Sequence, residues 1–266
     1  RVRVADGGIY ILDAERQAVL RYRYDAASGA VLDAEPQVIL QQGDIVDGVT
    51  VGSLADITWL ELNPGIVDRP LLLVLDRNNN LFRYDPRVEG ARLMEINGQA
   101  DWRNASQVQT YFGRIYVADE GQNQIFRYNP AQPDADLDPW FRPETLVNLA
   151  GVISMEIDGD IWLLFGNGNI LRYRNREQLP FSLEAGAERA EEPVDLYVTK
   201  EERNEIYLAD AGEDRILVYS KDGVFEKQLK AAEGDLLRGL SGIYIEELNE
   251  TLYILTKTGL YTHPLL

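Results

Sequence analysis

Few residues of this chain have the types needed for catalysis. Its one histidine is His263, followed by Pro264 close to the C-terminal end, and there is no cysteine. A zinc centre built from several histidines cannot be assembled, and a serine nucleophile would depend on a base in a terminal tail. Thiolate chemistry and disulfides are excluded. The sequence therefore predicts no catalytic residue, no bound metal and no cofactor, and a protein that is not an enzyme.

A second group of candidates consists of aspartates that end short apolar segments. They are Asp13, Asp76, Asp119 and Asp210. Such carboxylates can bind calcium, or they can accept hydrogen bonds from backbone N–H groups one or two residues later and tighten a turn. Their surroundings lack the alternating carboxylates and the glycine of a calcium loop. Turn formation is therefore the favoured interpretation.

The elements that must position these residues repeat along the chain. Each repeat has an apolar strand, a polar turn and a strand that ends in tyrosine. The tyrosines Tyr24, Tyr84, Tyr128, Tyr173, Tyr219 and Tyr261 are separated by 60, 44, 45, 46 and 42 residues. A period of about 40 to 50 residues with several short strands is typical of a β-propeller. The sequence predicts one all-β domain, a six-bladed propeller with four-stranded antiparallel blades at 1–42, 54–97, 105–149, 151–185, 193–230 and 240–266.

Several details of the blades follow from the same pattern. In blade three we expect an insert, Asn129 to Glu144, before a fourth strand at Thr145 to Leu149, and a helical turn is expected at Gly234 to Arg238. Val2 to Ala5 should be the innermost strand of blade one. Because Pro264 interrupts the residues after Tyr261, the last blade should have three strands. We expect residues upstream of Arg1 to supply its fourth strand.

Arginine precedes tyrosine in Arg83-Tyr84, Arg127-Tyr128 and Arg172-Tyr173. These arginines could form an anion-binding ladder. The alternative is that each lies along the surface between blades and pairs with a carboxylate. The second interpretation is favoured, because both faces of such a strand pack against neighbouring blades.

Two segments resemble a known repeat. Ile206 to Gly223 (Ile-Tyr-Leu-Ala-Asp-Ala-Gly-Glu-Asp-Arg-Ile-Leu-Val-Tyr-Ser-Lys-Asp-Gly) is similar to the NHL repeat, and Tyr116 to Tyr128 matches nearly as well. The resemblance implies a recognition or sensor propeller, as in ectodomains of bacterial signalling proteins associated with Ser/Thr kinases or phosphatases. It also implies an extracellular or periplasmic location within a larger protein. A few NHL-like propellers are lyases or lactonases, so a divergent metal-dependent enzyme is the alternative.

The net charge of the chain limits the classes of molecule that it can bind. Lys plus Arg number 26 and Asp plus Glu number 44, which gives 26 − 44 = −18. A surface this acidic repels phosphate backbones. No window is long and apolar enough to span a bilayer. We expect a protein, a peptide or a small polar ligand as partner, with no nucleic acid and no membrane insertion within this segment, although the start at Arg1 leaves an upstream anchor open.

Propeller geometry suggests a place for binding. The innermost strands should begin around the mouth of the central axis, where a mixed polar and aromatic rim can hold a ligand. The residues expected there are Asp56, Ser106, Asp195 and Ser241, with Trp102, Arg103 and Arg238 just before them. The alternative is that they line a water-filled channel. On either interpretation, Asp195→Ala should leave stability almost unchanged.

Trp140 and Phe141 form the second binding candidate. They lie beside Arg142 in the blade-three insert, and aromatic residues and arginine are enriched at protein interfaces. They could equally fold back and cover the outer edge of their own blade. The sequence does not decide between the two.

Overall fold

The fold is made almost entirely of β-strands. The computed structural model describes residues 1–5, 7–25, 31–61, 70–88, 90–184, 188–200 and 203–265. These residues form six antiparallel sheets, five with four strands and the last with three, and one small two-stranded hairpin. The chain divides into two compact units: one is Val2–Ala150, and the other is Gly151–Leu266 together with Arg1. Each unit contains three of the six blades of a β-propeller fold.

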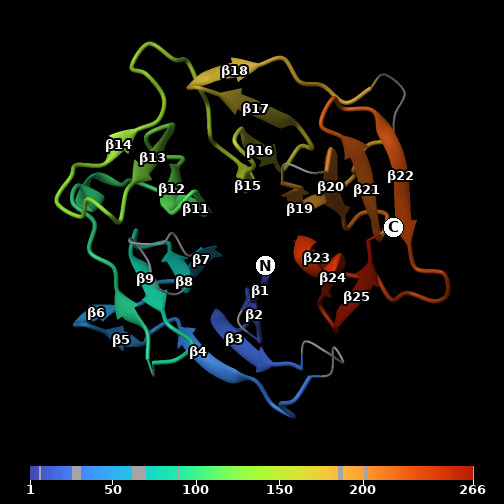
Figure 1. Cartoon of the computed structure of the whole chain (residues 1–266), viewed down its shortest axis with the longest axis horizontal. Helices are drawn as coiled ribbons and strands as arrows, with labels where there is room; N and C mark the ends of the chain where they lie inside the picture. The colour runs from blue at the N-terminus through green and yellow to red at the C-terminus, as the bar shows by residue number, and fades with distance from the viewer. Residues whose placement is uncertain are drawn as a thin grey trace. The chain divides into compact units, whose positions relative to one another are not determined.

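The first unit holds blades one to three (Figure 1). Blade one consists of β1 (Val2–Ala5), β2 (Gly8–Asp13), β3 (Ala18–Arg23) and β4 (Gln37–Gln41). A hairpin of β5 (Ile45–Val46) and β6 (Val49–Thr50) precedes blade two, which consists of β7 (Leu54–Leu60), β8 (Leu71–Asp76), β9 (Leu81–Tyr84) and β10 (Arg92–Leu93). The 3₁₀ helix η1 (Gln99–Asp101) leads into blade three, with β11 (Ala105–Tyr111), β12 (Arg114–Asp119), β13 (Gln124–Tyr128) and β14 (Asp138–Pro139).

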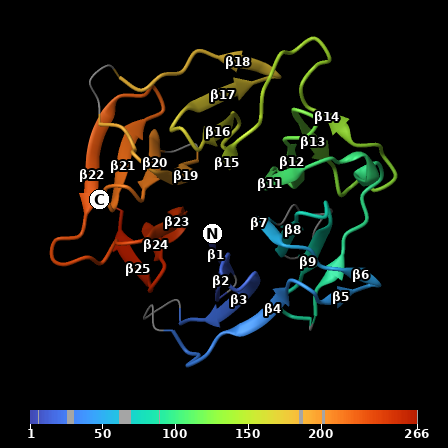
Figure 2. The ribbon, with the colours of Figure 1, turned by 180° about the vertical axis from the view of Figure 1, so that it is seen from behind.

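The second unit holds blades four to six. Blade four has β15 (Val152–Ile157), β16 (Ile161–Phe165), β17 (Ile170–Arg174) and β18 (Glu177–Leu179). Blade five has β19 (Pro193–Val198), β20 (Glu205–Asp210), β21 (Arg215–Ser220) and β22 (Phe225–Lys230), which lie side by side in chain order in both views (Figure 1, Figure 2). Blade six has β23 (Leu240–Glu246), the 3₁₀ helix η2 (Glu247–Asn249), β24 (Thr251–Thr256) and β25 (Leu260–Pro264).

The apolar core lies between successive blades within each unit. One cluster joins blades two and three through Leu73, Leu75, Val108 and Tyr128, and others join blades one and two, four and five, and five and six. The strands are too short and too apolar on both faces to be stable singly, so within each unit successive sheets bury their facing surfaces against each other. The predicted propeller, its blade count and the burial of Tyr128 are confirmed.

Blade three corrects one expectation. Its fourth strand is not Thr145 to Leu149, which has no strand structure. Instead β14, inside the predicted insert, pairs with Phe126 and Arg127. Proline is tolerated in this strand because it is the outer edge of the sheet. The predicted helical turn at Gly234 to Arg238 is also wrong, since these residues form non-helical turns.

The last blade agrees with its prediction. Its sheet contains β23, β24 and β25, without a fourth strand among the described residues. Val2–Ala5 pairs with β2 of blade one, as expected, through Val4 opposite Ile9. In the described part of the chain, no helix is long and apolar enough to cross a membrane.

Candidate functional site

The aspartates at the ends of the second strands organise turns. The buried Asp119 carboxylate accepts four backbone N–H groups: Gly121 (2.9 Å) and Gln122 (3.1 Å) in the turn that follows, and Arg103 (2.7 Å) and Asn104 (3.0 Å) before the innermost strand. Asp210 is similarly bonded to Glu191 and Glu192 before β19 and to Gly212 after β20. These two carboxylates tie the entries of blades three and five to the turns that follow their second strands. The turn interpretation is confirmed.

Asp56 and Asp195 do not lie on an exposed rim. Both are buried at bulges in the inner strands β7 and β19. A bulge leaves a backbone N–H outside the ladder, and the residue after the next blade's bulge donates to each: Val108 N–H to Asp56 Oδ2 (3.0 Å) and Ile243 N–H to Asp195 Oδ2 (3.0 Å). Asp195 also forms an ion pair with Arg1. The expectation that Asp195→Ala leaves stability almost unchanged assumed an exposed side chain, and this assumption is wrong.

The other predicted rim residues differ in burial and in their contacts. Ser106 is buried, and its hydroxyl has no hydrogen-bond partner among the described residues. Ser241 is half-buried and donates to Leu255 O (3.3 Å). The Arg238 side chain is 77% exposed and lies 3.6 Å from Asp235. Arg103 is exposed, and its backbone N–H donates to Asp119 Oδ2.

Trp140 and Phe141 fold back onto blade three. Both are buried and pack edge to face, with ring centroids 5.1 Å apart. The backbone N–H of Trp140 donates to Ile125 O (2.7 Å), and the backbone N–H of Phe141 donates to Gln124 Oε1 (2.7 Å). Their burial leaves them unavailable as exposed anchors and favours the packing alternative.

The arginines of the Arg-Tyr pairs act within the fold. Arg127 pairs with Asp138 on β14, and Arg172 pairs with Asp160 (2.5 Å) while its guanidinium lies 4.6 Å from the centroid of Trp162. Arg83 is exposed. The favoured interpretation holds for Arg127 and Arg172, because each guanidinium pairs with a carboxylate of its own blade.

The ionisation of Asp160 in blade four should make the stability of the protein depend on pH. Burial by itself raises the pKa of its carboxyl, but hydrogen bonds from Arg174 and Arg172, with their charges, together act more strongly and hold the pKa below its usual value. Such a group stabilises the fold above the unfolded pKa of about 3.9 and loses this effect as the pH falls through the lower folded pKa. In urea titrations at pH 7 and at pH 3, Asp160→Asn should lose less stability on acidification than the unmodified protein. An equal loss in both proteins would contradict this assignment.

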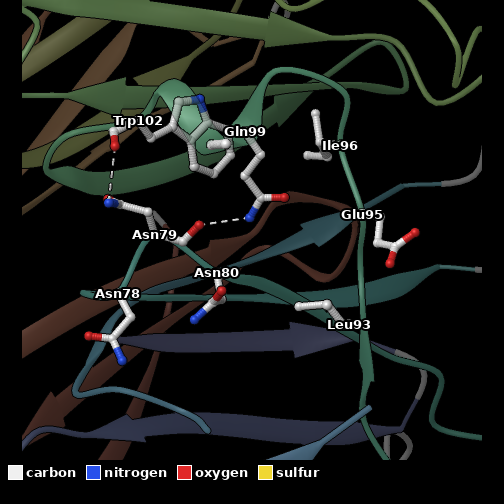
Figure 3. Close-up of a pocket in the computed structure, with 9 residues that line it drawn as sticks. Asn78, Asn79, Asn80, Leu93, Glu95, Ile96, Gln99 and Trp102 are labelled. Carbon is white, nitrogen blue, oxygen red and sulfur yellow. Dashed lines mark hydrogen bonds between the residues drawn. The ribbon is translucent and has the colours of Figure 1, made fainter. Parts of the chain in front are cut away.

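One pocket within the first unit combines polar and apolar groups. It lies between the turn from β8 to β9 and the segment that leads from β10 through η1 to blade three, and its volume is about 320 Å³ (Figure 3). This volume is at the lower end of the range for small-molecule sites. Its lining residues are Asn78, Asn79, Asn80, Leu93, Glu95, Ile96, Gln99, Ala100 and Trp102.

Asn79 holds the two walls of this pocket together. Its Nδ2 donates to Trp102 O (3.3 Å), its Oδ1 accepts the Ala105 N–H (2.9 Å), and its backbone oxygen accepts Gln99 Nε2 (2.7 Å) (Figure 3). Asn79 has φ +64°, a left-handed conformation that asparagine adopts more readily than most residues. The turn of blade two is thereby fixed against the entry to blade three.

Asp47 supports the wall formed by β10. It accepts hydrogen bonds from the Leu93 N–H (2.9 Å) and from Arg92 Nη1 (3.1 Å). The Leu93 hydrogen bond, and then that of Arg92, lowers the pKa of Asp47 below its usual value. Asp47 and Gly48 both have positive φ, as a type I′ hairpin turn requires, so the β5–β6 hairpin presents this carboxylate to β10.

Of the residues predicted for binding, the structure places Trp102 in this pocket. Asparagines 78 to 80 and Gln99 were not predicted. Three consecutive asparagines after Asp76 were a readable signal in the sequence, because such turns expose amide groups. Gln99 gave no comparable signal, since 20 residues separate it from Asn79.

Comparison with known proteins supports the fold and goes no further. No family model matches the chain, and no curated protein matches it either. The resemblance to NHL repeats therefore stays a prediction.

Many solved structures have a similar backbone, and two of them illustrate the likeness. A chain in the crystal structure of a nidogen/laminin complex superposes with a TM-score of 0.64 at 12% identity, over 94% of this chain and 87% of that one. A chain in the crystal structure of BBS1N in complex with ARL6DN gives a TM-score of 0.53 at 12% identity, over 97% of this chain and 74% of that one. At such identities the likeness concerns the fold alone, and that fold is a six-bladed β-propeller.

Proposed function

We propose that this chain is a non-catalytic recognition propeller whose binding site is the pocket between blades two and three. The observation that carries the proposal is the pocket itself, in which amides and one carboxylate stand beside apolar side chains. A few placed polar groups among apolar ones are typical of sites that bind without chemistry. The ligand is a protein segment, a peptide or a small polar molecule.

The use of the buried carboxylates supports recognition over catalysis. Asp76 accepts Gly52 N–H and Asn80 Nδ2 at one oxygen, and the N–H groups of Asn78 and Asn80 at the other. Asp119 and Asp56 are bonded to backbone N–H groups in the same way. A carboxylate saturated by backbone donors has little capacity left to act as a base or to bind a substrate.

The proposed class of partner and the proposed cellular location rest on resemblance to other proteins. Both superposed structures are complexes: a nidogen/laminin complex, and BBS1N in complex with ARL6DN. Together with the NHL-like segments, this supports a protein or peptide partner for this chain. From the NHL-like segments alone we propose an extracellular or periplasmic location, as a sensor domain of a larger bacterial signalling protein.

The proposal is tested by measuring binding and turnover on the same sample. Peptides and small polar molecules are screened by thermal shift, and those that bind should raise Tm, since a ligand at 100 times its Kd stabilises by about 2.7 kcal/mol. Ala100→Trp should abolish the shift by filling the pocket, whereas Ala135→Trp, an exposed alanine outside the pocket lining, should not. Lactone and ester substrates should not be turned over. Chelator-sensitive turnover with a stoichiometric divalent ion would overturn the proposal and establish a metal-dependent propeller enzyme.

A further inference from the structure

The amide groups of the pocket have fixed orientations. Asn80 Nδ2 donates to the carboxylate oxygen Oδ2 of Asp76 (3.0 Å), and Gln99 Nε2 donates to the backbone oxygen of Asn79 (2.7 Å). A carboxylate and a backbone carbonyl can only accept, so these contacts identify the amino end of each amide. The opposite ends, Asn80 Oδ1 and Gln99 Oε1, are left as acceptors. Figure 3 shows the Gln99 oxygen on the side of Glu95 and Ile96.

The Trp102 indole N–H is a buried donor without a hydrogen-bond partner among the described residues, and Figure 3 shows it on the side of the ring away from Asn79 and Asn80. The other polar groups of the lining add acceptors and no cation. Glu95 is exposed and is the one formally charged residue of the lining. The Asn79 amide is already used at both ends. Asn78 is exposed and can rotate its amide to present either end. The pocket therefore offers two oriented carbonyl oxygens and a carboxylate, which suit a ligand rich in hydrogen-bond donors.

Charge and shape limit this ligand further. The chain has a net charge of −18, so its field attracts cations. Leu93, Ile96 and Ala100 supply apolar surface in the same cavity. An ammonium group is a compact donor of three hydrogen bonds, and its alkyl stem packs on apolar surface.

We propose that this pocket binds a primary ammonium group carried on an alkyl stem. The group comes either from a lysine side chain of a partner peptide or from a free alkyl diamine. The carbonyl oxygens of Asn80 and Gln99 and the Glu95 carboxylate accept its hydrogens, and Leu93 and Ile96 contact the stem. This inference rests on the proposed function and assigns its ligand class.

Isothermal titration with defined probes tests the assignment. The probes are Nα-acetyl-lysine-N-methylamide, its Nε-acetylated form, the norleucine analogue, an acetyl-Gly-Lys-Gly amide peptide and 1,4-diaminobutane. The amines should bind, and the Nε-acetylated and norleucine probes should not. Tighter binding of the peptide identifies a protein lysine as the source, and tighter binding of the diamine identifies a free amine.

Variants locate the binding. Because Glu95 is exposed, Glu95→Gln should weaken amine binding by about 2- to 5-fold, and less in high salt. Glu95→Lys should abolish it. Gln99→Met removes an acceptor for a charged donor and should weaken binding by about 10- to 100-fold, with only a small fall in Tm from the lost hydrogen bond to Asn79 O. Glu144→Gln, an exposed glutamate outside the lining, is the matched control and should bind as the unmodified protein does.

The outcomes separate this inference from the function on which it rests. Equal binding of the lysine and Nε-acetyl-lysine probes, or equal amine binding by Glu95→Lys, would overturn the ammonium assignment. Pocket binding of a neutral or acidic ligand in place of amines would also overturn it, and would leave the recognition function intact. If no ligand class binds in the pocket, both proposals fail.

Discussion

Replacing Asp119 by alanine is expected to lower the free energy of unfolding by about 3 to 5 kcal/mol. Its buried carboxylate accepts backbone N–H groups from Arg103, Asn104, Gly121 and Gln122. Removal leaves these donors without a partner at the junction where blade three begins. Each buried donor without a partner costs about 1 to 3 kcal/mol, and water that enters the gap recovers part of the loss.

Asp13 is the matched control at the corresponding position of blade one. It is partly exposed and accepts two N–H groups, from Glu15 (3.0 Å) and Arg16 (2.9 Å). Water can replace the carboxylate there, so Asp13→Ala should cost about 1 kcal/mol or less. Both variants are compared by urea unfolding with the slope m monitored. Similar losses at the two positions would show that the links to Arg103 and Asn104 contribute nothing.

Tyr128→Ala is expected to lower the free energy of unfolding by a similar amount, about 3 to 5 kcal/mol. This is the usual cost of deleting a buried aromatic side chain. Tyr128 ends β13 and is 4% exposed within the cluster that joins blades two and three. Its removal leaves a cavity that neighbouring strands, held in their ladders, cannot fill. Thermal and urea unfolding of the purified variant give the measurement.

The same substitution at Tyr261 serves as the comparison. Tyr261 lies opposite Ile254 on β25, the outer strand of the three-stranded blade, and is only partly buried. Its register position is that of Phe126 in blade three, two residues from Tyr128 on the same face of the strand. Less apolar area is lost there and the site can rehydrate, so Tyr261→Ala should cost about 1 to 2 kcal/mol. If Tyr261→Ala proves as damaging as Tyr128→Ala, the outer strand of blade six is covered by something that the described residues do not include.

Much of the candidate site lay beyond prediction. Trp102 was predicted for binding from its place before an inner strand, and it lines the pocket. Glu95 and Gln99 belong to a connection without periodicity, and nothing local distinguishes them from other surface polar residues. Their segment is brought to the pocket by Asn79, which is hydrogen-bonded to both Gln99 and Trp102 across blades.

The number of blades, the first three strands of each blade and the burial of Tyr84, Tyr128, Tyr173 and Tyr219 were determined by the amino-acid sequence alone. These features depend on alternation along short strands and on turn residues, both of which act within a few residues. The fourth strand of blade three was decided by tertiary structure, because burial of Trp140 and Phe141 and the pairing of Arg127 with Asp138 bring Asp138–Pro139 against β13. The inward position of Asp56 and Asp195 was also decided there. A carboxylate is buried where donors compensate for its lost hydration, and at these two positions the donors include the N–H groups of Val108 and Ile243, which belong to the next blade.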